Sequence, residues 1–153
     1  LPDRGDLPVE ITLPVMPAKK SESISIAVAN LKVRWDDINA AYEPDRMPNL
    51  AQERWTNLAD LLNLANKEKC HLLVLPEVSI PWAWFPLMTS YARRHKMGLI
   101  FGLEHIVSHQ TGTPAVSNTV IAALPYVHEG ITQCAVIART KNHYSPAEAD
   151  DFR

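Results

Sequence analysis

Two charged residues follow apolar runs of strand length, which makes them candidates for catalysis. Glu77 comes directly after the apolar run 72–76, so we expect it at the carboxyl end of a buried strand. Open α/β sheets bind ligands beyond those strand ends, and partial desolvation there suits a carboxylate to general-base catalysis. Lys141 closes a later strand, where its positive charge can stabilise a developing oxyanion. Taken alone, Glu77 also fits a helix cap or a salt-bridged carboxylate, and Lys141 a solvated side chain.

Histidine and cysteine side chains give weaker signals. His105 and His109 are four residues apart, a spacing that binds a metal on a helix, but they fall in a polar segment without an H-E-x-x-H pattern. Cys134 lies in the middle of a predicted strand, where we expect a small buried hydrophobe. Cys70 ends a predicted helix, and nothing near it in sequence indicates an activated thiol. The sequence therefore predicts neither a metal nor a cofactor.

The composition is that of one globular domain. The chain has 153 residues, 46% of them hydrophobic, and a net charge of −2, so it can bury a core and has no basic excess for nucleic acid. No apolar run approaches the ~20 residues that a membrane-spanning helix needs. Two cysteines without a C-x-x-C pair favour a reduced, cytoplasmic protein. Residues 1–23 are rich in proline, so we expect a linker or extension there and a domain over 24–153.

An alternation of strands and helices would position the candidate residues. The predicted strands are 24–29, 71–75, 98–103, 116–124 and 131–138, and the predicted helices are 50–69 and 82–96. Right-handed crossovers between the first three strands, followed by an antiparallel pair, give an α/β fold with a mixed sheet and helices on one face. The polar segments 34–48 and 105–115 are predicted loops, and Asn49 is a predicted N-cap.

Four local patterns, in order, resemble the nitrilase or carbon–nitrogen hydrolase superfamily. They are the opening strand 26–30, the glutamate-bearing strand 73–77, Gly102-Leu103-Glu104 followed by Ser117-Asn118-Thr119, and the lysine motif 139–144. The resemblance implies an α-β-β-α sandwich that hydrolyses a small-molecule amide or nitrile through a Glu-Lys-Cys triad, without a cofactor. It implies that Glu77 is the general base, that Lys141 stabilises the oxyanion, and that Glu148 matches a second, orienting glutamate.

The nucleophile of that family follows the lysine, whereas no cysteine follows Lys141 in this sequence. We therefore expect the N-terminal part of a nitrilase-like domain, belonging to a larger protein such as a nitrilase-fused anti-phage reverse transcriptase. It would form a homo-oligomer or pack against the rest of its parent chain. A half-sandwich leaves one apolar sheet face bare, and we expect Val28, Val74, Ile100 and Ile121 near that core.

Two alternatives remain open. A magnesium-dependent endonuclease/phosphatase sandwich also begins with a strand ending in Asn, here Asn30, and delivers a metal-binding glutamate, here Glu77. That family usually has Gln where this chain has Pro76, and it has no role for Lys141. The other alternative is a catalytically inactive nitrilase-like accessory domain. A cysteine further along the parent chain would favour the hydrolase. Asp-x-Asn and Asp-His motifs there would favour the nuclease. The absence of both would favour the inactive domain.

Overall fold

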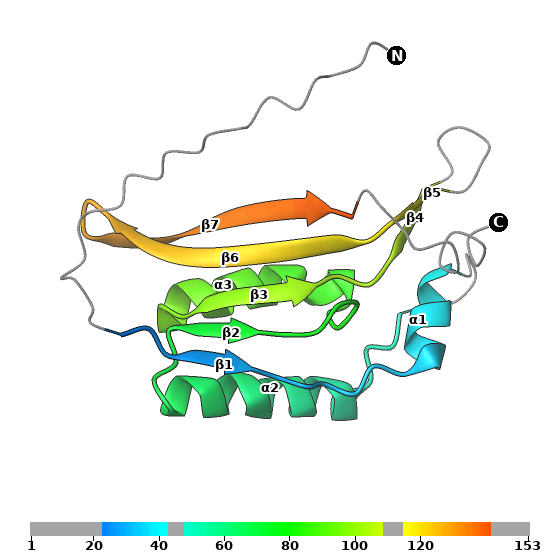
Figure 1. The fold of residues 1–153 in the computed structure, drawn as a ribbon, viewed down its shortest axis with the longest axis horizontal. Coiled ribbons are helices and arrows are strands. Elements are labelled where there is room, and N and C mark those ends of the chain that lie inside the picture. Colours follow the sequence, from blue (N-terminus) through cyan, green and yellow to red (C-terminus); the bar gives the residue numbers. More distant parts are fainter. Residues whose placement is uncertain (1–22, 43–47, 109–114, 142–153) are drawn as a thin grey trace, which may run out of the picture.

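The computed structural model of the chain describes residues 23–42, 48–108 and 115–141, and a mixed five-stranded sheet runs through them (Figure 1). The strands are β1 (Ile26–Val28), β2 (Leu72–Val74), β3 (Gly98–Gly102), β4 (Ile106–Ser108), β5 (Ala115–Ser117), β6 (Thr119–His128) and β7 (Ile131–Thr140). The helices are α1 (Trp35–Tyr42), α2 (Gln52–Lys67) and α3 (Phe85–His95), with a 3-10 turn, η1 (Trp82–Trp84), before α3. Among the described helices, none combines the length and apolar character that crossing a membrane requires.

The strand order of the sheet is β1-β2-β3-β6-β7. β1, β2 and β3 are parallel, and β6 and β7 each run antiparallel to the strand before them in this order. These relations confirm the predicted parallel strands and the predicted antiparallel extension. β4 and β5 pair with each other in a separate two-stranded sheet.

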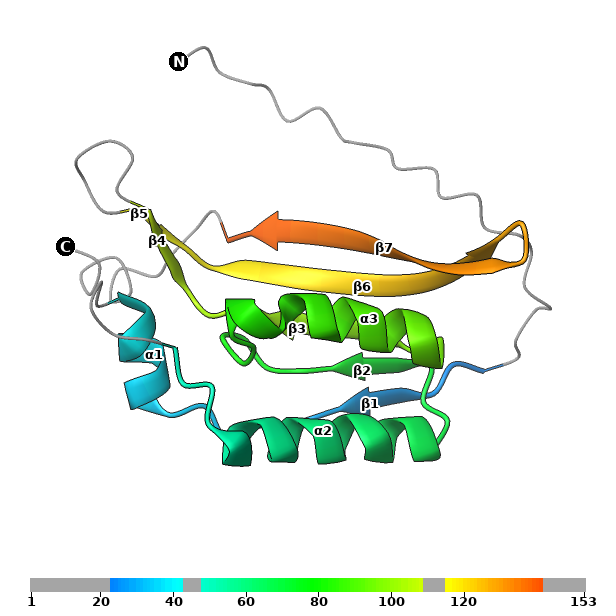
Figure 2. The ribbon, with the colours of Figure 1, turned by 180° about the vertical axis from the view of Figure 1, so that it is seen from behind.

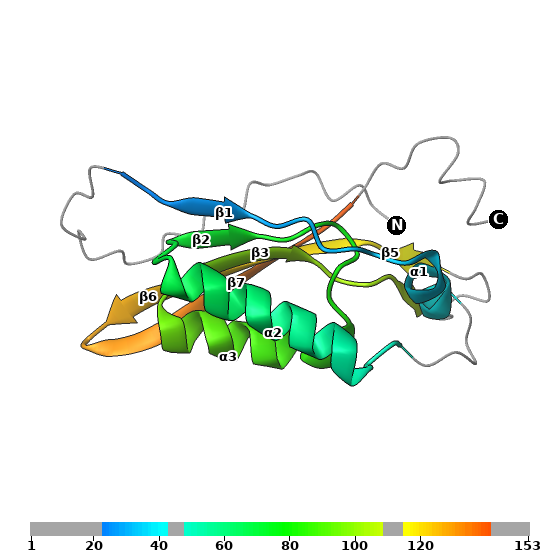
Figure 3. The same cartoon turned by 90° about the horizontal axis from the view of Figure 1, so that it is seen from below.

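Helices α2 and α3 lie side by side on the same face of the sheet (Figures 2 and 3), which confirms the predicted one-sided cover. The helix α3 begins with Pro86 in its first turn, where the missing N–H has no helical partner to lose. It ends at Lys96, whose φ of 54° is left-handed and stops the helix. Basic residues in its last turn complement the helix dipole.

The hydrophobic core fills the space between this face and the helices. Residues alternate along each strand, so one set from every central strand faces α2 and α3. Burial of a leucine or phenylalanine contributes about 1.5–3 kcal/mol relative to exposure, so this layer dominates the stability of the fold. The buried core side chains include Leu58, Leu62, Leu73, Met88, Leu99, Phe101, Ile121 and Ala123.

The other face of the sheet, which we call the open face, is not covered by any described helix. The expectation that four named residues would lie at the bare sheet face is confirmed for Val28, which is 80% exposed there, and is wrong for Ile121, which is 2% exposed under the helices. Val74 and Ile100 are half-buried. The register puts Ile121 on the helix side and the other three on the open face. Exposed neighbours on the open face are Ile26, Val120 and Ile137.

Two predicted loops contain regular structure instead. The segment 34–48 was expected to be a loop, but its residues 35–42 form α1, which has acidic residues in its first turn as the helix dipole favours. The segment 105–115 was expected to be a loop, but it contains β4 and the first residue of β5. Asn49 is not an N-cap: α2 is capped at Ala51, whose N–H donates to Oδ1 of Asn49 at 3.1 Å.

Candidate active site at the carboxyl edge of the sheet

Glu77 and Lys141 meet at one edge of the sheet. The parallel strand β2 ends at Val74, three residues before Glu77, and the antiparallel strand β7 ends at Thr140, directly before Lys141. The two strand ends therefore lie at the same edge, and Nζ of Lys141 is 3.5 Å from Oε1 of Glu77. The side chains are 32% and 53% exposed, respectively, so water and small solutes reach both. The predicted proximity of these two residues is confirmed.

Asn118 connects the two charged residues. It directly precedes β6 and is buried, and its side-chain Nδ2 donates a hydrogen bond to Oε1 of Glu77. Its backbone carbonyl accepts a hydrogen bond from the N–H of Lys141 at 2.8 Å. One residue therefore orients the carboxylate and fixes the backbone that carries the lysine. The sequence patterns include Asn118, but they gave it no place in the site.

A tight loop holds Glu77 against β3. Ser79 donates from Oγ to the carbonyl of Pro76 at 2.7 Å, and its N–H donates to the carbonyl of Gly102 at 3.0 Å. The N–H of Gly102 in turn donates to the carbonyl of Pro76 at 3.2 Å. Val78 has a φ of 55°, an unfavourable value for a β-branched residue. The surrounding contacts must therefore hold the loop in this conformation. A Cβ on Gly102 would lie 2.7 Å from Cα of Glu77, which explains why a glycine stands there.

The site borders the open face of the sheet. Ile121 and its partner Ala138 face the helices, so Asn118 and Lys141, three residues away in each case, face the other way. Glu77 reaches this side because its carboxylate contacts both of them. The carboxylate, the ammonium and the amide therefore surround one polar corner beside an exposed apolar surface.

A second ion pair lies behind this corner, on the helix side. Nη2 of Arg54 is 2.6 Å from Oε1 of Glu104, but the angles of this contact are not those of a hydrogen bond. The side chain of Glu104 is only 4% exposed. Burial raises the pKa of Glu104 above its ordinary value, and the charge of Arg54 opposes this effect. Arg54 also donates to the carbonyls of Asn49 at 2.9 Å and Ser79 at 3.2 Å. The pair thus ties α2 to the loop that carries Glu77.

Among the described residues, no other candidate joins the site. Cys134 is on the helix side of β7, opposite to Lys141, and burial raises the pKa of its thiol. It is therefore not placed to act as the nucleophile. Glu148 and His109 lie outside the described residues. Trp84 is buried in the core, edge-on to Trp55. In the described part of the chain, no three His, Cys, Asp or Glu side chains gather as metal ligands would.

Comparisons with known proteins do not assign the chain to a family. No protein-family model matches the sequence, and no curated protein matches it significantly.

Proposed function

We propose that this chain supplies the glutamate and lysine of a nitrilase-like carbon–nitrogen hydrolase site, and that a cysteine from outside this sequence completes it. The observation that carries the proposal is the contact of Glu77 with both Lys141 and Asn118 at the carboxyl edge of the sheet. A carboxylate that only capped a helix would need no lysine, and a solvated lysine would need no carboxylate. The open face would then carry the second sheet of an α-β-β-α sandwich.

In the proposed reaction, Glu77 acts as general base and Lys141 as an electrostatic stabiliser. The carboxylate takes the proton of the cysteine thiol, the sulfur bonds to the carbonyl carbon of an amide, and negative charge develops on the carbonyl oxygen. The ammonium of Lys141 stabilises that charge. The C–N bond then breaks, the carboxyl proton passes to the nitrogen, and ammonia leaves a thioester. Glu77 next takes a proton from water, and the water oxygen bonds to the thioester carbon. The C–S bond then breaks, the carboxyl proton of Glu77 passes to the sulfur, and the acid is released.

Asn118 fits this chemistry as a positioning residue. Its hydrogen bond to Oε1 of Glu77 leaves Oε2 as the oxygen with which to accept a proton. Its backbone bond to Lys141 keeps the ammonium beside the same carboxylate as the reaction proceeds. Preorganised groups of this kind need no rearrangement when charge develops, which is the main source of electrostatic catalysis.

The test is ammonia release from a panel of short amides and nitriles by the natural protein that carries this chain. We expect Glu77→Gln and Lys141→Ala each to lower turnover by about 10²–10⁴-fold, the usual range for a lost acid–base or oxyanion-stabilising group. Thermal stability should change little, because half-exposed ion pairs contribute at most about 1 kcal/mol. Lys67→Ala, which removes an exposed lysine from α2, is the charge-matched control and should leave turnover unchanged.

The opposite pattern would contradict the proposal. If both variants keep full turnover but melt at lower temperature, the pair is structural. If instead a magnesium-dependent phosphodiesterase activity is lost in Glu77→Gln and kept in Lys141→Ala, the nuclease alternative is right.

A further inference from the structure

Strand β7 forms a long edge of the sheet with few of the features that normally protect an edge; its one charged residue, Arg139, lies near its end. It has ten residues and, in the described part of the chain, pairs only with β6. Its pairing with β6 is continuous over all ten residues, so no bulge interrupts it. Residues 131–138 contain neither a charge nor a proline. Natural edge strands usually carry charges, prolines or bulges that prevent further pairing, so this edge is suited to accept another strand.

The backbone groups that face outward from β7 can be identified. The N–H of Lys141 donates to Asn118, so the odd-numbered residues of this segment point toward β6. Backbone direction alternates along an antiparallel strand. The even-numbered residues Thr132, Cys134, Val136 and Ala138 therefore direct their N–H and C=O groups away from the sheet. An added strand would pair with these groups.

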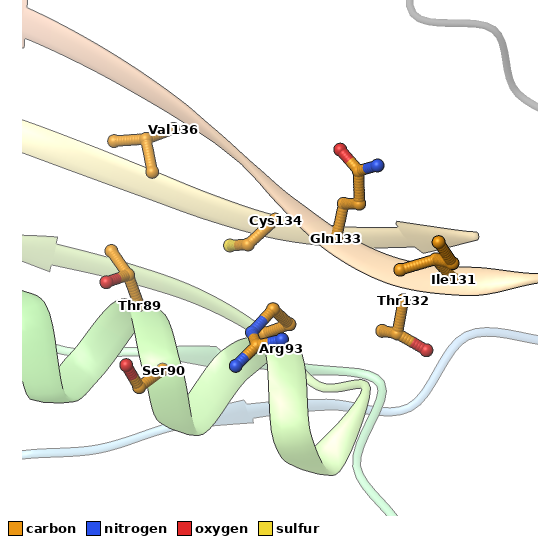
Figure 4. Close-up of a pocket in the computed structure, with 8 residues that line it drawn as sticks. All are labelled: Thr89, Ser90, Arg93, Ile131, Thr132, Gln133, Cys134 and Val136. Atoms are coloured by element: carbon orange, nitrogen blue, oxygen red, sulfur yellow. The ribbon is translucent and has the colours of Figure 1, made fainter. Parts of the chain in front are cut away.

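A groove of about 450 Å³ runs between β7 and helix α3 (Figure 4). In Figure 4, side chains of α3 and of β7 face each other across it. A strand added beside β7 would direct every second side chain toward this groove. The groove lining consists of Thr89, Ser90 and Arg93 from α3 and of Ile131, Thr132, Gln133, Cys134 and Val136 from β7.

We propose that this edge binds β7 of a second copy of the chain, antiparallel and around a two-fold axis at Cys134. The lack of charge favours this partner and this register. An uncharged edge fits an uncharged strand, and residues 131–138 are such a strand. With Cys134 opposite its own copy, residues 131–137 of the two strands pair along their whole length. Arg139 then lies beyond the paired segment, because the matching position, Glu129, belongs to the turn before β7.

The same arrangement brings the two copies of helix α3 to a distance at which helices pack. Adjacent strands are about 4.8 Å apart, and α3 packs under both β6 and β7. A two-fold axis through the β7–β7 contact therefore puts the two copies of α3 about 10 Å apart, within the range for packed helices. Both helices lie on the same face, so the two sheets become one continuous sheet. Arg93, whose charge acts on Cys134, comes near its own copy, which is the one unfavourable pair of this interface.

The first test combines sedimentation of the purified chain with thiol crosslinking. We expect a concentration-dependent dimer. Residues opposite each other in a hydrogen-bonded antiparallel pair have Cα atoms about 5.5 Å apart. A crosslinker with two methanethiosulfonate groups and a spacer of about 5 Å should therefore link two copies through Cys134, forming one disulfide with each thiol and releasing two sulfinates. Crosslinking should persist in Cys70→Ser and disappear in Cys134→Ser. A monomer at all accessible concentrations, or a dimer that crosslinks equally well without Cys134, would overturn the proposal.

The second test changes the edge without touching the β6–β7 ladder. Val136→Pro removes an outward N–H, and we expect it to raise the dimer dissociation constant at least tenfold. Val136→Lys puts a charge on the edge and should act alike, which guards against a folding defect in the proline variant. Arg93→Gln should strengthen the dimer, because it removes the like-charge pair across the two-fold axis. A dimer unaffected by both Val136 variants would assign association to the open face and refute the β7 interface.

Discussion

Gly102 is the point where β3 comes closest to the loop that carries Glu77, so Gly102→Ala tests how that loop is held. The added Cβ would lie 2.5 Å from the backbone N of Val78 and 2.7 Å from Cα of Glu77. Cβ atoms in proteins essentially never come within 3.0 Å of such atoms, and backbone atoms cannot rotate away as a side chain can. The loop must therefore move by about half an ångström or more relative to β3.

The cost can be estimated from two contributions. Forcing an extra methyl group into a packed site costs about 1–3 kcal/mol. The displaced loop also weakens hydrogen bonds to Gly102, which donates to Pro76 and accepts from Ser79 and Ile80, and the loss of one such bond costs about 1 kcal/mol. We expect a loss of about 2–4 kcal/mol in the free energy of unfolding. With a urea m-value of about 1.5 kcal/mol/M, the unfolding midpoint should fall by roughly 1.3–2.7 M.

Urea unfolding of the wild-type chain, Gly102→Ala and Gly98→Ala measures this effect. Gly98 is the matched control on the same strand: its added Cβ would meet the end of the Leu72 side chain at 2.9 Å, which can rotate aside. We expect that variant to lose less than about 1 kcal/mol. The NMR signal of the Glu77 carboxyl carbon should shift in Gly102→Ala and stay in place in Gly98→Ala. Equal midpoints for the two variants, or an unmoved Glu77 signal, would refute the close contact as the reason for Gly102.

Two further predictions concern the buried ion pair and the open face. Arg54→Met should lower the free energy of unfolding by about 3–5 kcal/mol, because Glu104 then stays buried without its cation; a loss under 1 kcal/mol would show that the pair is not needed. Burial raises the pKa of Glu104, so its contribution to stability is fully present below the unfolded-state pKa and is lost as pH rises through the folded-state pKa. Glu104→Gln should therefore flatten the fall in urea midpoint with rising pH, and an unchanged slope would count against this. Val28→Lys should reduce the binding of the dye ANS to the open face with the melting temperature unchanged, whereas undiminished dye binding would mean that the dye binds elsewhere.

The main strands and the two long helices follow from local sequence, whereas the cover of the sheet does not. Apolar runs of strand length and helical spacing are local properties, and they correctly predict parallel strands followed by an antiparallel pair. The helix α1 was not predicted, because a tertiary contact supports it: the side chain of buried Asp37 accepts a hydrogen bond from the side chain of Asn49 at 2.8 Å. Ile121 was expected at the open face because its strand is apolar, but its side chain packs under the helices. An apolar strand does not specify which of its two faces is covered.

The candidate site, too, is only partly predictable from the sequence. Glu77 and Lys141 are predictable because each ends a recognisable strand, and strand ends of the right direction share an edge. The hydrogen bond from Asn118 to Glu77 joins residues 41 positions apart and depends on the exact register of β6. The pair of Arg54 with Glu104 depends on how α2 lies against the sheet. Neither contact leaves a pattern in a single sequence.

The β6–β7 hairpin also has a consequence for how the site is assembled during folding. Asn118 and Lys141 flank the open end of this hairpin, whose strands are joined by a short turn at Glu129 and Gly130. Hairpins form within about 1–10 μs, whereas parallel strands must first close a long loop. We therefore expect the amide and the ammonium to be brought together early, in a locally folded unit, and the carboxylate of Glu77 to arrive only when β2 and β3 dock. The hairpin would then hold Lys141 beside Asn118 before Glu77 arrives, and the ion pair would form only with the last long-range pairing.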